Sequence, residues 1–133
     1  MKLSTLSKLS APILMAATLA LSSGQIQAGE AIHSGEFVGA SDHITTGNVT
    51  VERISSGFIV KLAKNFSLDG APEPSVGFGN DGKYDGSTSV GDLVMIEGAQ
   101  TFLVPENVDV TQFNEIYIWC DKFDVPLGVA TLN

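Results

Sequence analysis

Short apolar runs recur through this chain and are separated by Gly, Asn, Asp and Pro. In NVTVERI, Val49 and Val51 alternate with Thr50 and Glu52, which is the period of a strand with one buried face. Almost no segment after residue 28 has the period of an amphipathic helix. The pattern predicts an all-β fold. About seven or eight short strands favour a single-domain antiparallel β-sandwich, with a small β-barrel as the alternative.

Strands are expected in these segments: GEFVGA, NVTVERIS, GFIVKLAKNFSL, PSVGFG, NEIYIWC and PLGVATL. DLVMIEGAQTFLVP is predicted to form a tight hairpin, because Gly98–Ala99 can occupy a two-residue turn whose first position favours positive φ. NDGKYDGSTSVGD is rich in turn formers and is predicted to be a loop. Val125–Pro126 is expected to lie between the last two strands.

The beginning of the chain has the layout of a secretory signal. Lys2 and Lys8 precede the apolar run APILMAATLALSSG, and small and polar residues then lead to a cut expected after Ala28. A membrane-spanning helix needs about 20 apolar residues, so a retained anchor is the less favoured alternative. The prediction is a signal peptide at 1–28, one domain at 29–133, and an exported protein that is periplasmic or secreted.

The chain is strongly acidic beyond the expected cut. All 15 acidic residues follow Ala28 but only five of the seven basic residues do, so the formal net charge of this part is −10. Such a surface repels phosphate backbones and anionic lipid, which argues against a nucleic-acid partner. A cationic partner fits the charge, and so does solubility alone.

Cys120 is the only cysteine and directly follows the only tryptophan. Proteins of oxidising compartments usually carry cysteines in even numbers, and a single thiol cannot form an internal disulfide. In an extended strand Cys120 shares a face with Ile116 and Ile118, which fits a small buried core residue. The alternatives are a redox thiol, a ligand to metal or haem iron, and a disulfide between two chains. The neighbouring aspartates disfavour a freely ionised nucleophile.

Soft or imidazole ligands beyond the expected signal are few: His33, His43, Met95 and Cys120. By count they match a blue-copper site, which uses two histidines, a cysteine and a weak axial group. Haem with Cys120 or His43 as axial ligand is the other candidate cofactor, whereas covalent c-type haem is excluded because C-x-x-C-H does not occur. His43, in SDHITTG, also fits a loop residue that bonds to backbone.

The acidic stretch GNDGKYDGS invites comparison with a calcium loop. Asp81 and Asp85 do not follow the D-x-D-x-D-G spacing, and turn chemistry explains them equally well. Hydrolytic catalysis has no support, since G-x-S-x-G does not occur and the chain has only two histidines. An independent enzyme is the least favoured class, behind a non-catalytic electron-transfer or binding domain.

Three segments, FVGASDHITTGNVTV, DLVMIEGAQTFLVP and EIYIWCDKFDVPLGVATL, resemble in this order the landmarks of the DM-thirteen domain, also called the electron-transfer DM domain. The resemblance extends from about Gly35 to Leu132. The matching residues are Phe37, His43, Gly47, Gly98, Gln100, Phe102, Pro105, Ile118, Trp119, Cys120, Phe123, Gly128 and Ala130. The Ile-Trp-Cys-x-x-Phe portion is the most specific. The chain departs from the family at GAPEPSVGFG, where Glu73 and Pro74 interrupt the pattern.

The resemblance implies a β-sandwich related to extracellular haem- and sugar-binding domains, with a redox role for the single cysteine as a bare thiol or through a prosthetic group. It makes Cys120 and His43 the candidate redox or cofactor-binding residues. Supporting motif residues are Trp119, Phe123, Gly47 and Gln100. Trp119, on the opposite face of its strand, is expected to pack in the core.

The leading hypothesis is an exported electron-transfer module that acts with a redox partner protein or a small ligand. The alternative is a non-redox binding or adhesion module in which Cys120 is a core residue. Its motivation is the acidic surface and the long polar segment between Val76 and Asp92.

Overall fold

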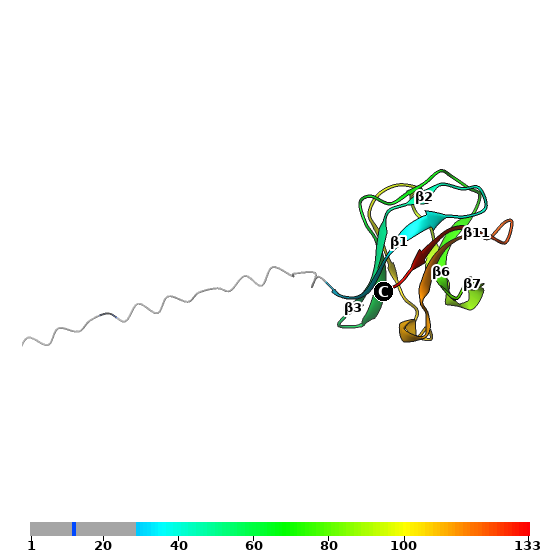
Figure 1. The fold of residues 1–133 in the computed structure, drawn as a ribbon. Coiled ribbons are helices and arrows are strands. Elements are labelled where there is room, and N and C mark those ends of the chain that lie inside the picture. Colours follow the sequence, from blue (N-terminus) through cyan, green and yellow to red (C-terminus); the bar gives the residue numbers. More distant parts are fainter. Residues whose placement is uncertain (1–11, 13–28) are drawn as a thin grey trace, which may run out of the picture.

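The computed structural model describes Pro12 and residues 29–133. Residues 29–133 contain one curled antiparallel sheet and a second, small sheet (Figure 1). The large sheet has the order β7–β6–β10–β11–β1–β3–β4–β9, with β8 also paired to β6, and the small sheet is β2–β5. The predicted all-β antiparallel fold is confirmed. The predicted signal peptide lies, apart from Pro12, outside the described residues.

The strands are β1 (Glu30–Gly39), β2 (Thr45–Thr46), β3 (Asn48–Ile54), β4 (Gly57–Leu62), β5 (Ser67–Leu68), β6 (Pro74–Asn80), β7 (Lys83–Asp85), β8 (Gly91–Asp92), β9 (Gln100–Leu103), β10 (Glu115–Cys120) and β11 (Val125–Thr131). Two short 3-10 turns, η1 (Gly86–Thr88) and η2 (Val110–Gln112), complete the elements. Within the described part of the chain, no helix has the length and apolar character needed to cross a membrane.

Strand β1 joins the two halves of the large sheet. Its first part, up to Glu36, pairs with β3, and its last residues, from Phe37 on, pair with β11. The register against β3 shifts between Ala31 and His33, and such a bulge bends a strand and increases its twist. The sheet therefore curls into a half-barrel, and the layers expected of a sandwich are halves of one continuous sheet.

The core lies on the inner face of this curled sheet. The alternation in the sequence places one side of each central strand inside, and Phe37 and Phe66 meet edge to face with ring centroids 5.6 Å apart. Fully buried apolar side chains are Val49, Val51, Val60, Leu62, Val76, Phe78, Val110, Ile116, Ile118 and Ala130. Strands from both halves of the sheet bury their inner faces in this core. This packing holds the end of β10, where the candidate site lies.

The segment NDGKYDGSTSVGD is not the loop that its composition predicts. Asp81 and Gly82 both have positive φ, +50° and +83°, and make a tight turn between two strands. β7 then pairs back onto β6, with Gly79 opposite Tyr84. Turn-forming residues in this segment therefore mark a very short hairpin, followed by η1 and β8.

The segment DLVMIEGAQTFLVP does not form the predicted tight hairpin. Residues 93–96 are not in a strand, and β9 pairs with β4 instead. The side chain of Gln100 replaces the expected ladder, because its Oε1 accepts from the amides of Val94 and Met95 and its Nε2 donates to the Met95 carbonyl. Gly98 does have the positive φ, +93°, that the prediction required.

The connection between β10 and β11 also lies elsewhere than predicted. The turn is formed by residues 121–124, and Asp124 adopts a φ of +55°. Val125 and Pro126 belong to β11, where Pro126 pairs with Trp119 at a register shift. Proline is tolerated in a strand at such an irregularity, because a ladder hydrogen bond is already missing there.

Candidate functional site

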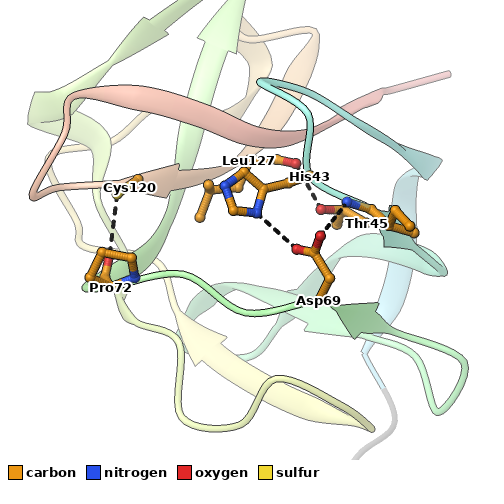
Figure 2. Close-up of polar contacts among 7 residues, drawn as sticks. His43, Thr45, Asp69, Pro72, Cys120 and Leu127 are labelled. Atoms are coloured by element: carbon orange, nitrogen blue, oxygen red, sulfur yellow. Dashed lines mark hydrogen bonds and ion pairs between the residues drawn. The ribbon is translucent and has the colours of Figure 1, made fainter.

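Cys120 is the last residue of β10 and lies between two neighbouring strands. Pro74 of β6 and Val125 of β11 are its register partners, and its side chain is 1% exposed. The Sγ–H group donates a hydrogen bond to the carbonyl oxygen of Pro72 at 3.2 Å (Figure 2). Its expected position on the face of Ile116 and Ile118 is confirmed, and so is its burial.

The backbone beside Cys120 is held from the neighbouring segment. The amide of Asp121 donates to the carbonyl of Glu73 at 3.0 Å, and the amide of Asp124 donates to the carbonyl of Cys120 at 2.8 Å. Pro74, which interrupts the family pattern, is the first residue of β6, a place where proline does not break a ladder. The thiol therefore sits in a fixed backbone frame with its proton directed at a carbonyl oxygen.

A surface pocket of about 310 Å³ adjoins this end of the sheet. Its lining residues are Glu73, Pro74, Asp92, Leu93 and Asp121, so three of the five carry carboxylates. Pro74 is the register partner of Cys120 and Asp121 follows it in the chain. A molecule that approaches the thiol from this side meets a negative field, which favours cations and repels anions.

His43 lies in the connection between β1 and β2 and is held by a carboxylate. Its Nδ1 is 2.8 Å from Oδ1 of Asp69, while Oδ2 of Asp69 accepts from the amide of Ile44 at 3.0 Å. The Ile44 amide and then the His43 imidazole keep the pKa of Asp69 below its ordinary value. The sequence suggested a bond from His43 to backbone, and the observed partner is a side chain.

The pairing with Asp69 orients the His43 ring. A carboxylate at Nδ1 sets which nitrogen carries the proton and leaves Nε2 as the acceptor. Figure 2 shows Nε2 turned away from Asp69, and the side chain of His43 is 29% exposed. His43 is thus a positioned imidazole with one nitrogen available for a proton or a ligand.

One short segment connects His43 with Cys120. Asp69 contacts the imidazole and Pro72 contacts the thiol, as Figure 2 shows along a single stretch of chain. Three peptide units span at most about 11 Å between the Cα atoms of these residues. No hydrogen bond joins His43 directly to Cys120 within residues 29–133. The fold therefore brings the two candidates to one end of the domain and relates them through segment 69–72.

The loop that carries His43 is also attached to β11. The hydroxyl of Thr45 donates to the carbonyl of Leu127 at 2.7 Å, and the amide of Ala40 donates to the same carbonyl at 3.0 Å. A Cβ at Gly128 would lie 2.6 Å from the Thr45 side chain, so only glycine leaves room for this contact. Gly128 thereby permits the loop to lie close against the strand that follows Cys120.

The expected metal ligands do not gather in the structure. His33 lies on β1, where its Nδ1 is 3.0 Å from the carbonyl oxygen of Asn133, and Met95 is half-exposed in the segment held by Gln100. Within residues 29–133, no group of three or more His, Cys, Asp or Glu side chains is arranged to hold a metal ion. The donor set does not fit a copper centre. A sulfur enclosed in the core likewise does not fit haem ligation in this arrangement.

Asp81 and Asp85, the acidic residues compared with a calcium loop, serve as turn residues. Asp81 accepts from the side-chain amide of Asn114 at 2.9 Å, and Asp85 caps η1 by accepting from the amide and hydroxyl of Ser87. The Ser87 hydroxyl and then its amide lower the pKa of Asp85. Turn chemistry, the alternative to calcium binding, accounts for both carboxylates.

Trp119 packs on the outer face of the sheet instead of the core expected for it. Its indole stacks on Tyr84 with centroids 4.3 Å apart and an interplanar angle of 19°, and Tyr117 meets both rings. A Cβ at Gly77 would lie 2.7 Å from the Tyr84 ring, so the glycine makes room for the stack. The aromatic cluster of Tyr84, Tyr117 and Trp119 thus covers the strands that carry Cys120 from the other side.

The other supporting motif residues have packing or turn roles. Gly47 has a φ of +108°, and a Cβ there would lie 2.5 Å from the Cα of Phe66. The Gln100 side chain holds the segment around Met95 through hydrogen bonds to its backbone. Phe123 is 63% exposed in the turn after Cys120, where Lys122 lies over its ring. Much of the motif around the candidate site is therefore explained by folding.

Asp69, Pro72 and Tyr84 were not identified by the sequence. Asp69 is one of 15 acidic residues, and Pro72 contributes only a backbone carbonyl, so neither carries a local signal. Tyr84 lies within the segment predicted to be a loop. Their roles follow from strand pairing that joins parts of the chain far apart in sequence.

The fold and these contacts define a class: an all-β domain in which one segment contacts both a sheltered thiol and a histidine oriented by a carboxylate. A family model described as Electron transfer DM13 matches residues 36–132, and the chain belongs to this family. The resemblance noted in the sequence is thereby confirmed. Comparison with curated proteins gave no match, and comparison with solved structures gave none either.

Proposed function

We propose that this protein is an exported electron-transfer module whose redox centre is the thiol of Cys120. The family description supports electron transfer. The observation that carries the assignment to this residue is the shared segment 69–72, which contacts the thiol at Pro72 and the oriented imidazole at Asp69. Export rests on the signal-like beginning of the chain.

The bare thiol suits the described geometry better than a ligand to a prosthetic group. Its chemistry is exchange with a disulfide of a partner protein or small molecule. Sγ of Cys120 forms a bond to one sulfur of that disulfide, and the bond between the two partner sulfurs breaks. The proton lost by Cys120 passes to solvent, and the leaving sulfur takes up a proton from solvent. Cys120 is oxidised to a mixed disulfide and the leaving sulfur is reduced to a thiol.

The burial of the sulfur gives this exchange a structural requirement. With 1% of the side chain exposed, the thiol meets a partner only when segment 69–72 or the turn at 121–124 moves aside. The adjoining carboxylates favour a cationic partner surface. A disulfide between two copies is disfavoured by the same burial and by the like charge of two acidic chains.

The test is exchange of the natively folded protein with cystamine, a cationic disulfide, followed by intact mass. We expect one cystamine half to add to the wild type and none to Cys120→Ser. Absorption spectra of both proteins, made in an oxidising compartment, are the companion measurement. A chromophore lost in Cys120→Ser would assign the centre to a bound prosthetic group.

A colourless protein that reacts with cystamine only after denaturation would contradict the proposal. The alternative would then hold, a non-redox binding module in which Cys120 is a core residue. In that case Cys120→Ser costs stability and leaves partner binding unchanged.

A further inference from the structure

Glu52 is a buried acid with one carboxylate oxygen that is not satisfied within the described part of the chain. It lies on β3 and is 9% exposed, and its Oε2 atom has no hydrogen-bond partner there. No basic side chain of residues 29–133 forms an ion pair with it. A buried carboxylate oxygen without a partner costs stability, so a cation close to Oε2 of Glu52 would stabilise the fold.

Gly29 is placed beside this carboxylate. Ala31 is the register partner of Glu52, and Gly29, two residues away, faces the same side of the sheet. A Cβ built on Gly29 would lie 2.8 Å from the Cβ of Glu52. From bond lengths, the nitrogen of Gly29 is then within about 6 Å of that Cβ. A glutamate carboxylate can therefore rotate to reach this nitrogen.

We propose that hydrolysis of the bond between Ala28 and Gly29 creates the missing partner, an α-ammonium group that pairs with Glu52. Water adds across this amide bond. Ala28 leaves as a carboxylate, and the nitrogen of Gly29 gains the protons of an ammonium group. The processed chain then begins one residue before β1 with its positive charge at a buried acid. This inference rests on the export part of the proposed function and not on Cys120.

Lys61 is the competing cation. It lines a pocket of about 260 Å³ together with Glu52, and it pairs in register with Thr50, diagonal to Glu52. Lys61 is exposed and makes no ion pair with Glu52, whereas the Gly29 backbone is fixed at close range. The N-terminus is therefore the better partner, because less side-chain entropy is lost on pairing.

The experiment expresses the full chain in a secreting bacterium and determines the N-terminus of the product by intact mass and sequencing. We expect the product to begin at Gly29. The α-amine is then labelled with an acylating reagent at neutral pH in the wild type, Glu52→Gln and Glu36→Gln. Glu36 is an exposed acid on β1, the strand that begins directly after the new terminus, and serves as the control.

Pairing holds the amine in its protonated, unreactive form. We expect labelling about tenfold slower in the wild type and Glu36→Gln than in Glu52→Gln, since a close opposite charge shifts such an equilibrium by a unit or more. If Glu52→Gln does not fold, the wild type labelled with and without urea provides the same comparison, with faster labelling expected in urea.

Three results would overturn the inference: an uncleaved chain, a product that begins at another residue, or labelling that is independent of Glu52. If Glu52 pairs with Lys61 instead, labelling is independent of Glu52 in the wild-type background and slows only in Lys61→Met, where the carboxylate becomes free to pair with the amine. None of these results depends on the cystamine reaction of Cys120. The pairing of Glu52 and the redox role of Cys120 are therefore tested independently.

Discussion

The Sγ atom of Cys120 lies 3.2 Å from the carbonyl oxygen of Pro72, and this contact places the only thiol of the chain against the segment that also holds His43 through Asp69. The thiol is thus sheltered by backbone, while the imidazole stays partly open to solvent. Access to Cys120 should depend on movement of this segment and on the charge of whatever approaches.

The first prediction concerns the charge of thiol reagents. In the native protein we expect cationic methanethiosulfonates to label Cys120 roughly tenfold faster than anionic ones, because the adjoining pocket contains three carboxylates. The measurement is the labelling rate at low and high salt. High salt should reduce the difference between the labelling rates of cationic and anionic reagents, since screening weakens electrostatic attraction to the carboxylates.

Asp121→Asn is the variant that tests the cause of this charge preference. It should reduce the difference between cationic and anionic reagents, whereas Glu106→Gln, an exposed acid outside the pocket, should not. Equal rates for all reagents in the wild type would show that thiol access does not pass through the acidic pocket.

The second prediction concerns the Asp69–His43 pair. The pKa of Asp69 is lower in the folded than in the unfolded protein, chiefly through the Ile44 amide and then His43. Its contribution to stability is therefore present above the ordinary value of 3.8 and is lost as the pH falls through the lowered pKa. Asp69→Asn should lower the urea midpoint at pH 7, and its difference from the wild type should shrink in acid.

Asp42→Asn is the matched control for the Asp69 variant. Asp42 is exposed in the loop that carries His43 and has a φ of +63°, a conformation that asparagine also tolerates. Its midpoint should follow the wild type at each pH. A constant difference between Asp69→Asn and the wild type from neutral to acidic pH would contradict the role given to ionised Asp69.

The third prediction separates backbone strain from crowding at glycine. Gly47 and Gly70 have nearly equal φ values, +108° and +109°, but a Cβ meets the Phe66 backbone only at Gly47. Gly47→Ala should therefore cost about 2 kcal/mol more than Gly70→Ala in the free energy of unfolding. Chemical denaturation of both variants measures this, and equal losses would show that strain alone requires glycine at position 47.

The fourth prediction uses Tyr117, whose hydroxyl donates to Glu115 at 2.9 Å. Burial and then this carboxylate raise the pKa of Tyr117 to about 12 from 10.0. The raised pKa stabilises the fold below pH 10, and this contribution is lost as the pH rises from about 10 to about 12. The free energy of unfolding should fall across that range more steeply in the wild type than in Tyr117→Phe. Parallel pH profiles of the wild type and Tyr117→Phe would contradict this contribution of Tyr117 to stability.

Local patterns in the sequence predict most of the strands correctly. NVTVERIS, PSVGFG and NEIYIWC alternate or are continuously apolar, and each contains an observed strand within a residue or two of its predicted ends. The exceptions are segments that do not pair with the strand expected from their position in the sequence. Residues 93–96 are apolar enough for a strand but make bonds to the Gln100 side chain, a contact that no periodicity encodes.

The sequence by itself determined that this is an all-β domain with one thiol on the buried face of a late strand, because strand period and side-chain alternation are local properties. Its motifs also indicated the family. Only the tertiary structure decided that Pro72 meets the thiol, that Asp69 orients His43, that Trp119 stacks on Tyr84, and that Gly29 lies beside Glu52. Each of these contacts joins separate strands or loops, and their geometry follows from how the sheet curls.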